Sequence, residues 1–290
     1  MSTNRFGELE VLCSVPKRTE FRHPTPLLFV HGAYMGAWCW KEHFLPWFSA
    51  RGWPSYAVSL SGHGASRNRD YLDFYSIDNY VEDIAEVAAK LPSPPVVIGH
   101  SMGGMVVQKY LERFNAPAAV LLASVPPQGL MPAAIGLMTS KPSLFMTLNT
   151  ILTGADIDFE NDLESLRDLM FHQPIDANDL VRYFALTQPE SRRALWDMTL
   201  FNLPRTSIIK KVPMLVIGGA HDQLITVGQV RSTAATYEHE AEIFEEFGHS
   251  MMLEHSWEKL AVRLDHWLCA HTDTLIETPG KRRHKSLQSM

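Results

Sequence analysis

The chain has 290 residues, of which 46% are hydrophobic and 20% are charged, so it can bury the core of one large α/β domain or of two small ones. Its formal net charge of −6 argues against a nucleic-acid-binding surface, and no run approaches the about 18 unbroken apolar residues of a membrane span. The N-terminal residues lack the apolar region of a signal peptide, and Cys13, Cys39 and Cys269 match neither a disulfide framework nor a metal site. We therefore expect a cytoplasmic protein.

Up to about residue 124, short apolar runs alternate with segments of helical periodicity. Continuous apolar runs are typical of strands buried on both faces of a sheet. In chain order the predicted elements are a strand over 8–15 with Thr19–Arg22 as its candidate partner, a strand over Leu27–Val30, a helix from Trp38 to about Ala50, a strand over Ser55–Leu60, a helix over Ser76–Leu91, a strand over Val96–Ile98, a helix from Met102 and a strand over Pro117–Ala123. This alternation predicts an α/β fold with a mostly parallel central sheet and helices on both faces.

The alternation stops over residues 125–209, which are rich in Leu, Met and Phe and show no strand pattern. We interpret this stretch as a helical insertion between two parts of the core, residues 1–124 and 210–270. The basic tail over 271–290 is expected to be disordered. In the second part of the core we predict strands over Pro213–Gly218 and Glu242–Glu246 and a final amphipathic helix over Glu254–Ala270.

Several large apolar side chains of the insertion either line a pocket for an acyl chain or only bury the insertion against the core. They are Met131, Leu144, Phe145, Met146, Met170 and Phe171. Within the same stretch, Met138–Thr153 is either a mobile lid or a fixed helix.

A single serine joins a predicted strand to a predicted helix. Gly99-His100-Ser101-Met102-Gly103 fits the G-x-S-x-G nucleophile elbow, in which the serine occupies a tight turn with costly backbone angles. A side chain two residues before or after the serine would collide as the chain reverses, which explains the glycines. The alternative is a glycine-rich turn that happens to contain a serine.

A serine hydroxyl needs a base to take its proton and an acid to orient that base. After such an elbow the acid and the histidine follow in that order, on loops behind later strands. Asp222 follows the predicted strand over Pro213–Gly218 and His249 follows the last strand, so we predict Asp222 as the orienting acid and His249 as the general base.

Other residues compete for these two roles. His221 adjoins Asp222 and is expected to point away from it, and His255 is expected inside the last helix. Glu245 and Glu246 are interpreted as exposed strand residues.

Acyl transfer also needs fixed N–H donors for the developing oxyanion. The first is predicted to be the backbone N–H of Met102, directly after the nucleophile. The second is expected from the His31-Gly32-Ala33 loop, at the N–H of Ala33, with His31 supporting the loop by a hydrogen bond.

Taken together, these motifs resemble the α/β-hydrolase fold superfamily, in its branch with a helical cap. The matching residues are His31-Gly32-Ala33 with Gly36-Ala37-Trp38, Gly62-His63-Gly64-Ala65-Ser66, Gly99-His100-Ser101-Met102-Gly103-Gly104, Asp222 and Gly248-His249. The first motif is similar to plant methylesterases and hydroxynitrile lyases, and the second and third are similar to monoacylglycerol lipases and lysophospholipase-like esterases. Ser59 and Ser61 stand where many members carry Asp and Arg, a departure that concerns the anchoring of this loop.

The resemblance and the predicted triad imply a serine hydrolase that cleaves carboxylic esters through an acyl-enzyme on Ser101, without a cofactor or a metal. The expected substrate is a small or medium hydrophobic acyl ester, a monoacyl lipid or a thioester. Other chemistry on the same fold is the alternative: hydroxynitrile cleavage, carbon–carbon bond hydrolysis, perhydrolysis or cofactor-free oxygenation. A non-catalytic ligand receptor is a further alternative, and a monomer and a homodimer both remain open.

Overall fold

A single eight-stranded sheet runs through the computed structural model, which describes residues 2–17, 22–131, 135, 138 and 159–272. The strands lie in the order β1-β2-β4-β3-β5-β6-β7-β8. They are β1 (Ser2–Phe6), β2 (Leu9–Ser14), β3 (Leu27–Val30), β4 (Ser55–Val58), β5 (Val96–His100), β6 (Ala119–Leu122), β7 (Met214–Gly219) and β8 (Ala241–Phe244). β2 pairs antiparallel with β1 and β4, and all other neighbours are parallel, which confirms the predicted mostly parallel sheet.

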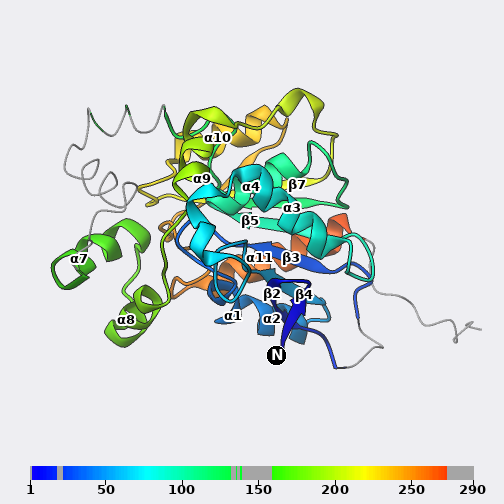
Figure 1. Cartoon of the computed structure of the whole chain (residues 1–290), viewed down its shortest axis with the longest axis horizontal. Coiled ribbons are helices and arrows are strands. Elements are labelled where there is room, and N and C mark those ends of the chain that lie inside the picture. The colour runs from blue at the N-terminus through cyan, green and yellow to red at the C-terminus, as the bar shows by residue number, and fades with distance from the viewer. Residues whose placement is uncertain (1, 18–21, 132–134, 136–137, 139–158, 273–290) are drawn as a thin grey trace, which may run out of the picture.

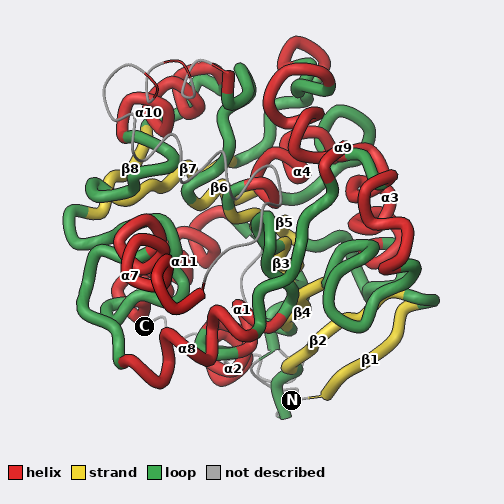
Figure 2. Tube along the Cα trace, turned by 60° about the vertical axis from the view of Figure 1, so that its left-hand side comes forward, coloured by secondary structure: helices red, strands yellow, loops and turns green. Residues whose placement is uncertain are grey.

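Helices cover both faces of this sheet. In Figure 2 the strands run in their sheet order across the view, with α3, α4, α9 and α10 on one side and α1, α2 and α11 on the other. The helices are α1 (Trp38–Lys41), α2 (Phe44–Ala50), α3 (Ile77–Ala88), α4 (Met102–Tyr110), α7 (Phe159–Met170), α8 (Ala177–Ala185), α9 (Arg192–Trp196), α10 (Val227–Thr236) and α11 (Trp257–His271), with 3-10 turns over Arg69–Phe74 and Thr206–Ile208 and a π-helical turn over Asp197–Phe201.

Two hydrophobic cores result, one on each face of the sheet. Strand β3 shows the reason, because its side chains alternate between the faces: Leu28 and Val30 join the core under α3 and α4, and Phe29 joins the core under α1, α2 and α11. A four-residue strand buried on both sides explains the unbroken apolar run in the sequence.

Two predicted helices differ in the structure. The candidate strand over Thr19–Arg22 lies outside the described residues, except for Arg22, and β2 is paired with β1 and β4. The helix predicted from Trp38 to Ala50 is divided between Lys41 and Phe44. Pro46 explains the break, because in a continuous helix its ring would collide with the carbonyl of the residue four positions earlier. The last helix begins at Trp257 rather than at Glu254.

Between β6 and β7, the described residues form helices and turns but no strand. Leu180 and Tyr183 of α8 join the core on the α1 and α11 side, whereas Ala194 and Leu195 of α9 join the core on the α3 and α4 side. The segment therefore passes from one face of the sheet to the other. Figure 1 shows α7 and α8 together at one end of the molecule, beyond the sheet. The boundaries 125 and 209 of an inserted unit stay a prediction.

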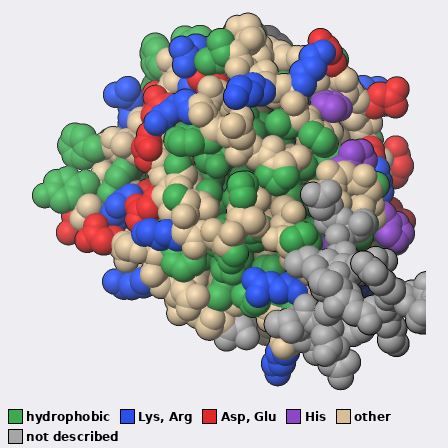
Figure 3. Space-filling model, turned by 90° about the vertical axis from the view of Figure 1, so that its right-hand side faces the viewer, with side chains coloured by type: hydrophobic (Ala, Val, Ile, Leu, Met, Phe, Trp, Pro, Cys, Tyr) green, Lys and Arg blue, Asp and Glu red, His purple; other side chains and the backbone are tan. Residues whose placement is uncertain are grey.

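At the opposite end of the molecule from α7 and α8, positive and negative side chains are interspersed with hydrophobic ones (Figure 3). Among the helices of the described ranges, none is both long and apolar enough to cross a membrane. Leu144, Phe145 and Met146, nearly all of Met138–Thr153, and the tail after residue 272 lie outside the described residues.

Candidate active site

Ser101 lies at the end of β5, directly before α4, as the elbow motif predicts. Its φ of 53° and ψ of −120° are backbone angles that a residue with a side chain rarely adopts. The turn is held by its own main chain: the N–H of Ser101 donates to the carbonyl of Leu122 at 3.0 Å, and the Ser101 carbonyl accepts the N–H of Val125 at 3.1 Å. The neighbouring strand β6 therefore supports the strained residue.

The elbow glycines are required by backbone contacts. A Cβ atom on Gly99 would lie 2.3 Å from the carbonyl oxygen of Gly103, and one on Gly103 would lie 2.4 Å from the carbonyl oxygen of His31. Backbone cannot give way as a flexible side chain can, so both positions exclude any larger residue. The collision expected from the sequence is therefore present at both positions.

Ser101, His249 and Asp222 form one hydrogen-bonded chain. The Oγ of Ser101 lies 3.1 Å from Nε2 of His249, and Nδ1 of His249 lies 2.8 Å from Oδ2 of Asp222. An ionised carboxylate only accepts hydrogen bonds, so Nδ1 carries the proton and the lone pair of Nε2 faces the serine hydroxyl. His249 and Asp222 are buried, whereas Ser101 is partly exposed. This arrangement suits proton transfer from an accessible hydroxyl to an oriented imidazole.

The other oxygen of Asp222 is occupied by its own loop. Oδ1 accepts the backbone N–H groups of Leu224 and Ile225, both at 2.8 Å. These bonds orient the carboxylate toward His249.

The His31–Ala33 loop lies against the elbow. A Cβ atom on Gly32 would be 2.9 Å from Nδ1 of His100 and 3.0 Å from Cβ of Ser101. Within the described part of the chain, the backbone N–H groups of Ala33 and Met102 donate no hydrogen bond. The His31–Ala33 loop and the start of α4 thus each provide one free N–H donor beside Ser101.

Two buried histidines hold this region together. His31 contacts the carbonyl oxygen of Gly32 through Nδ1 at 2.8 Å and accepts the N–H of Leu60 at Nε2 at 3.0 Å, so it supports its loop as expected. Burial lowers the pKa of His31 to about 3, which keeps the ring neutral. His100 lies 2.9 Å through Nε2 from the carbonyl oxygen of His249 and so connects the elbow to the loop of His249.

The Ser59 and Ser61 positions do anchor their loop. Ser59 donates to Glu10 at 2.7 Å and accepts the N–H of Ala37 at 3.0 Å, and Ser61 donates its hydroxyl to Asp83 at 2.8 Å. Short hydroxyls therefore hold this loop, with Glu10 and Asp83 supplying the carboxylates.

The competing residues lie elsewhere. The ring of His221 stacks on that of His172 with centroids 3.5 Å apart, and His249 instead is the histidine within hydrogen-bond distance of Asp222. His255 lies in the turn before α11 and not inside the helix, and it is exposed. Glu245 and Glu246 are exposed as predicted, but they belong to the turn after β8 because the strand ends at Phe244.

Sequence reasoning overlooked Glu254, which is buried beside the His249 loop. Its carboxylate accepts the N–H groups of Gly248 and His172 at 2.8 Å and of Gln173 at 3.1 Å. Burial raises the pKa of this carboxyl although the three donors act in the opposite direction. The available signal for a buried carboxylate was an acidic residue within an apolar stretch. The helical periodicity of the residues that follow Glu254 instead suggested that it begins the last helix.

Two of the apolar side chains singled out in the insertion, Met170 and Phe171, pack against the core. Phe171 is buried in the core under α1 and α11, and its ring stacks on Tyr183 with centroids 6.4 Å apart. Met170 is partly buried against the same core. Both thus follow the alternative in which these side chains bury the insertion.

A sequence model described as the alpha/beta hydrolase family matches residues 27–263, which include the elbow, Asp222 and His249. The chain belongs to the alpha/beta hydrolase family. The expected resemblance is therefore confirmed, and the matched range covers every strand from β3 to β8.

Curated relatives of this chain include plant esterases. The pFDCC methylesterase MES16 of Arabidopsis thaliana is 28% identical over 219 residues, which are 68% of this chain and 76% of that protein. The probable esterase PIR7A of rice (Oryza sativa) is 33% identical over 133 residues, 43% of this chain and 50% of that protein. Matches to methylesterases 3, 2 and 1 of A. thaliana span only 54%, 37% and 39% of those proteins.

Solved structures with the same fold are similar over nearly the whole chain. The N-acyl homoserine lactonase AidH has a TM-score of 0.71 at 20% identity and covers 94% of this chain and 98% of its own. The esterase EaEST of Exiguobacterium antarcticum has a TM-score of 0.70 at 18% identity and covers 90% of this chain and 95% of its own. At these identities the likeness shows a shared fold.

Proposed function

We propose that this alpha/beta hydrolase is a serine esterase that cleaves carboxylic esters through an acyl-enzyme on Ser101. The observation that carries the proposal is the hydrogen-bonded chain from Ser101 through His249 to Asp222, with the serine on a strained elbow. The plant relatives named as methylesterases favour a small alcohol as the leaving group. The acyl part is a small or medium hydrophobic group, with monoacyl lipids and thioesters as further candidates.

The geometry supports one sequence of steps. His249 takes the proton of Ser101 through Nε2 as the hydroxyl attacks the carbonyl carbon, and Asp222 stabilises the resulting imidazolium. The N–H groups of Ala33 and Met102 bind the oxyanion, each worth roughly 3–4 kcal/mol of transition-state stabilisation. His249 then protonates the leaving alcohol, and water cleaves the acyl-enzyme with His249 again acting as the base.

We further propose that residues 125–209 act as a cap over Ser101. Three contacts bring this segment to the site: the ring of Tyr183 stacks on Trp38 at 5.9 Å, the N–H of Ser250 donates to the carbonyl of Met170 at 2.8 Å, and the N–H of Gln188 donates to the carbonyl of Tyr34 at 3.0 Å. Tyr34 and Ser250 directly follow Ala33 and His249 in the chain, and Trp38 belongs to the helix that follows the Ala33 loop. A cap fastened in this way restricts which esters reach the serine.

The test is turnover of p-nitrophenyl esters from acetate to palmitate, together with methyl esters and lactones, by the wild type, Ser101→Ala and Ser232→Ala. Ser232→Ala is the control, because it makes the same chemical change at an exposed serine on α10. We expect activity that peaks at one acyl length, is lost in Ser101→Ala and is unchanged in Ser232→Ala. Labelling of Ser101 by a fluorophosphonate is the second readout. Wild-type turnover by Ser101→Ala would remove the proposal.

A further inference from the structure

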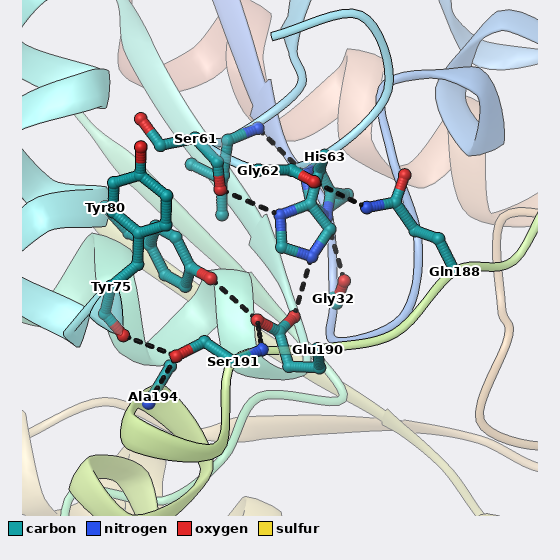
Figure 4. A network of polar contacts seen from close by, with 12 residues as sticks. Gly32, Ser61, Gly62, His63, Tyr75, Tyr80, Gln188, Glu190, Ser191 and Ala194 are labelled. Carbon is teal, nitrogen blue, oxygen red and sulfur yellow. Dashed lines mark hydrogen bonds and ion pairs between the residues drawn. The ribbon is translucent and has the colours of Figure 1, made fainter. Parts of the chain in front are cut away.

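A buried polar network links the loop after β4 to the segment between α8 and α9 (Figure 4). At its centre, Nε2 of His63 lies 3.0 Å from Oε2 of Glu190, and both side chains are 0% exposed. The other oxygen of Glu190 accepts the hydroxyl of Tyr80 and the N–H of Ser191, both at 2.7 Å. Every hydrogen-bonding atom of the carboxylate is therefore occupied.

The two side chains form an ion pair. Nδ1 of His63 lies 3.2 Å from the carbonyl oxygen of Ser61, which only accepts, so Nδ1 carries a proton while Nε2 faces the carboxylate. Burial by itself lowers the pKa of His63, but the Glu190 carboxylate, the Ser61 carbonyl and the charge of Asp83 together raise it. Burial likewise acts to raise the pKa of Glu190, but the His63 charge and the hydrogen bonds from His63, Tyr80 and Ser191 together lower it. Both groups are thus held in their charged forms.

Stability alone does not account for such a pair. Removing two charges from water costs several kcal/mol per ion, and apolar side chains of similar volume would stabilise the fold about as well. The pair instead fixes the chain around Glu190 in one position, because each charge has its partner only there. The contacts that this segment makes are therefore fixed as well.

Gln188, two residues before Glu190, contacts Tyr34, which follows Ala33, and the loop of His63. Its backbone N–H donates to the carbonyl of Tyr34 at 3.0 Å. Its side-chain amide accepts the N–H of Gly64 at 2.8 Å and donates to the carbonyl of Gly62 at 2.9 Å, on either side of His63. Gln188 and Glu190 thus both contact the loop of His63 (Figure 4), and Gln188 also contacts Tyr34.

Tyr34 directly follows Ala33 and has a φ of 65°, in the left-handed region that a tyrosine rarely adopts. Such a conformation persists only where the surroundings hold it. The N–H of Gln188 on the Tyr34 carbonyl is one support, and the N–H of Met35 on the Gly32 carbonyl at 3.3 Å is another. The loop that carries the Ala33 N–H is therefore strained and depends on the cap segment.

We propose that Glu190 and Gln188 are positioning residues that hold the Gly32–Tyr34 loop so that the Ala33 N–H meets the oxyanion. This inference deepens the proposed function and rests on it. The His63–Glu190 pair fixes the segment in place, and the hydrogen bond from Gln188 to the Tyr34 carbonyl then fixes Tyr34. An oxyanion donor acts only within tenths of an ångström of its place, so loosening the loop lowers the rate of the chemical step more than substrate binding.

Four variants test the inference with an ester that the wild type turns over, at a temperature well below every Tm. In Glu190→Gln, the amide oxygen still accepts from Tyr80 and Ser191, and the amide N–H donates to a neutral His63. Glu190→Ala and Gln188→Ala remove the anchor and the clamp, respectively. Glu112→Ala is the matched control, because the side chain of Glu112 is also buried and fastens another part of residues 125–209 to the core, through the Arg205 N–H at 2.8 Å, away from Ser101. Glu112 also pairs with Lys109 of α4 at 3.2 Å.

We expect Glu190→Ala to lower kcat about 10- to 100-fold with KM changed less than about threefold, and Gln188→Ala to lower kcat in the same way but less. Glu190→Gln should stay within about threefold of the wild type, and Glu112→Ala should lower Tm without lowering kcat. If Glu190→Ala does not fold, Gln188→Ala decides the matter.

Wild-type kcat in folded Gln188→Ala and Glu190→Ala would overturn the inference, as would an equal loss of kcat in Glu112→Ala. The outcome for Ser101→Ala separates the two proposals. Wild-type turnover by Ser101→Ala removes the proposed function and this inference with it. If Ser101→Ala is inactive but the Glu190 and Gln188 variants are fully active, the proposed function stands and only this inference is removed.

Discussion

Nε2 of His249 lies 3.1 Å from Oγ of Ser101, although 148 residues separate them in the chain. The loops after β5 and β8 carry them, and the carboxyl ends of parallel strands bring such loops to one edge of the sheet. Contacts between the loops complete the approach, since His100 lies within hydrogen-bond distance of the carbonyl oxygen of His249.

Replacing Asp222 by Asn should lower kcat about 10³- to 10⁴-fold while the protein stays folded. The amide oxygen can still accept the N–H groups of Leu224 and Ile225, which preserves the loop. The amide nitrogen, however, donates toward Nδ1 of His249, which moves the imidazole proton to Nε2 and leaves no base for Ser101. Steady-state kinetics and circular dichroism of the two proteins check this. An Asp222→Asn variant with more than about a tenth of wild-type kcat would show that Asp222 does not orient the base.

Replacing Gly103 by Ala should destabilise the protein by about 1–3 kcal/mol, because its Cβ would lie 2.4 Å from the carbonyl oxygen of His31. Gly228 in α10 is the control: its Cβ would meet only Thr226, at 3.9 Å. Alanine there should stabilise the helix by up to about 1 kcal/mol. Urea unfolding of both variants measures the two effects. Equal stability of both variants would mean that the elbow tolerates a side chain at Gly103.

Replacing Glu254 by Ala should cost about 1–3 kcal/mol of unfolding free energy, because the buried N–H of Gly248 and the partly buried N–H groups of His172 and Gln173 lose their acceptor. Activity should fall as well, since Gly248 precedes His249. Glu246→Ala is the control, because Glu246 pairs with Lys259 on the surface, where such pairs contribute about 0–1 kcal/mol. Chemical denaturation and kcat give the comparison, and an equal effect of both substitutions would contradict the role assigned to Glu254.

The stability gained from the His63–Glu190 pair should depend on pH at both ends. The pKa of Glu190 is lowered from 4.5, so its contribution is present above that value and is lost as the pH falls through the folded pKa. The pKa of His63 is raised from 6.5, so its contribution is complete below that value and is lost as the pH rises through the folded pKa.

The measurement is Tm of the wild type and of Glu190→Gln from about pH 4 to about pH 9. We expect the difference in Tm between the two proteins to be greatest between pH 4.5 and 6.5 and to decrease on either side. A difference that is constant over the whole range would show that the pair is not charged.

The amino-acid sequence by itself determined the elements whose cause is local. Unbroken apolar runs predicted strands such as β3, and Gly99 and Gly103 identified Ser101 as an elbow residue, because close backbone contacts admit no other residue there. The order of motifs along the chain was enough to select Asp222 and His249. Local rules also misjudged boundaries: the ends of α11 and β8 were displaced, which placed His255 in a helix and Glu246 in a strand.

Only the tertiary structure decided which distant polar groups meet. His63 and Glu190 are 127 residues apart, and nothing in the periodicity around either one indicates a partner. Hydrophobic patterns specify which face of an element is buried, but not which buried charge lies opposite. That depends on how the segment between α8 and α9 crosses the edge of the sheet, where burial in a low dielectric makes each charge require its partner.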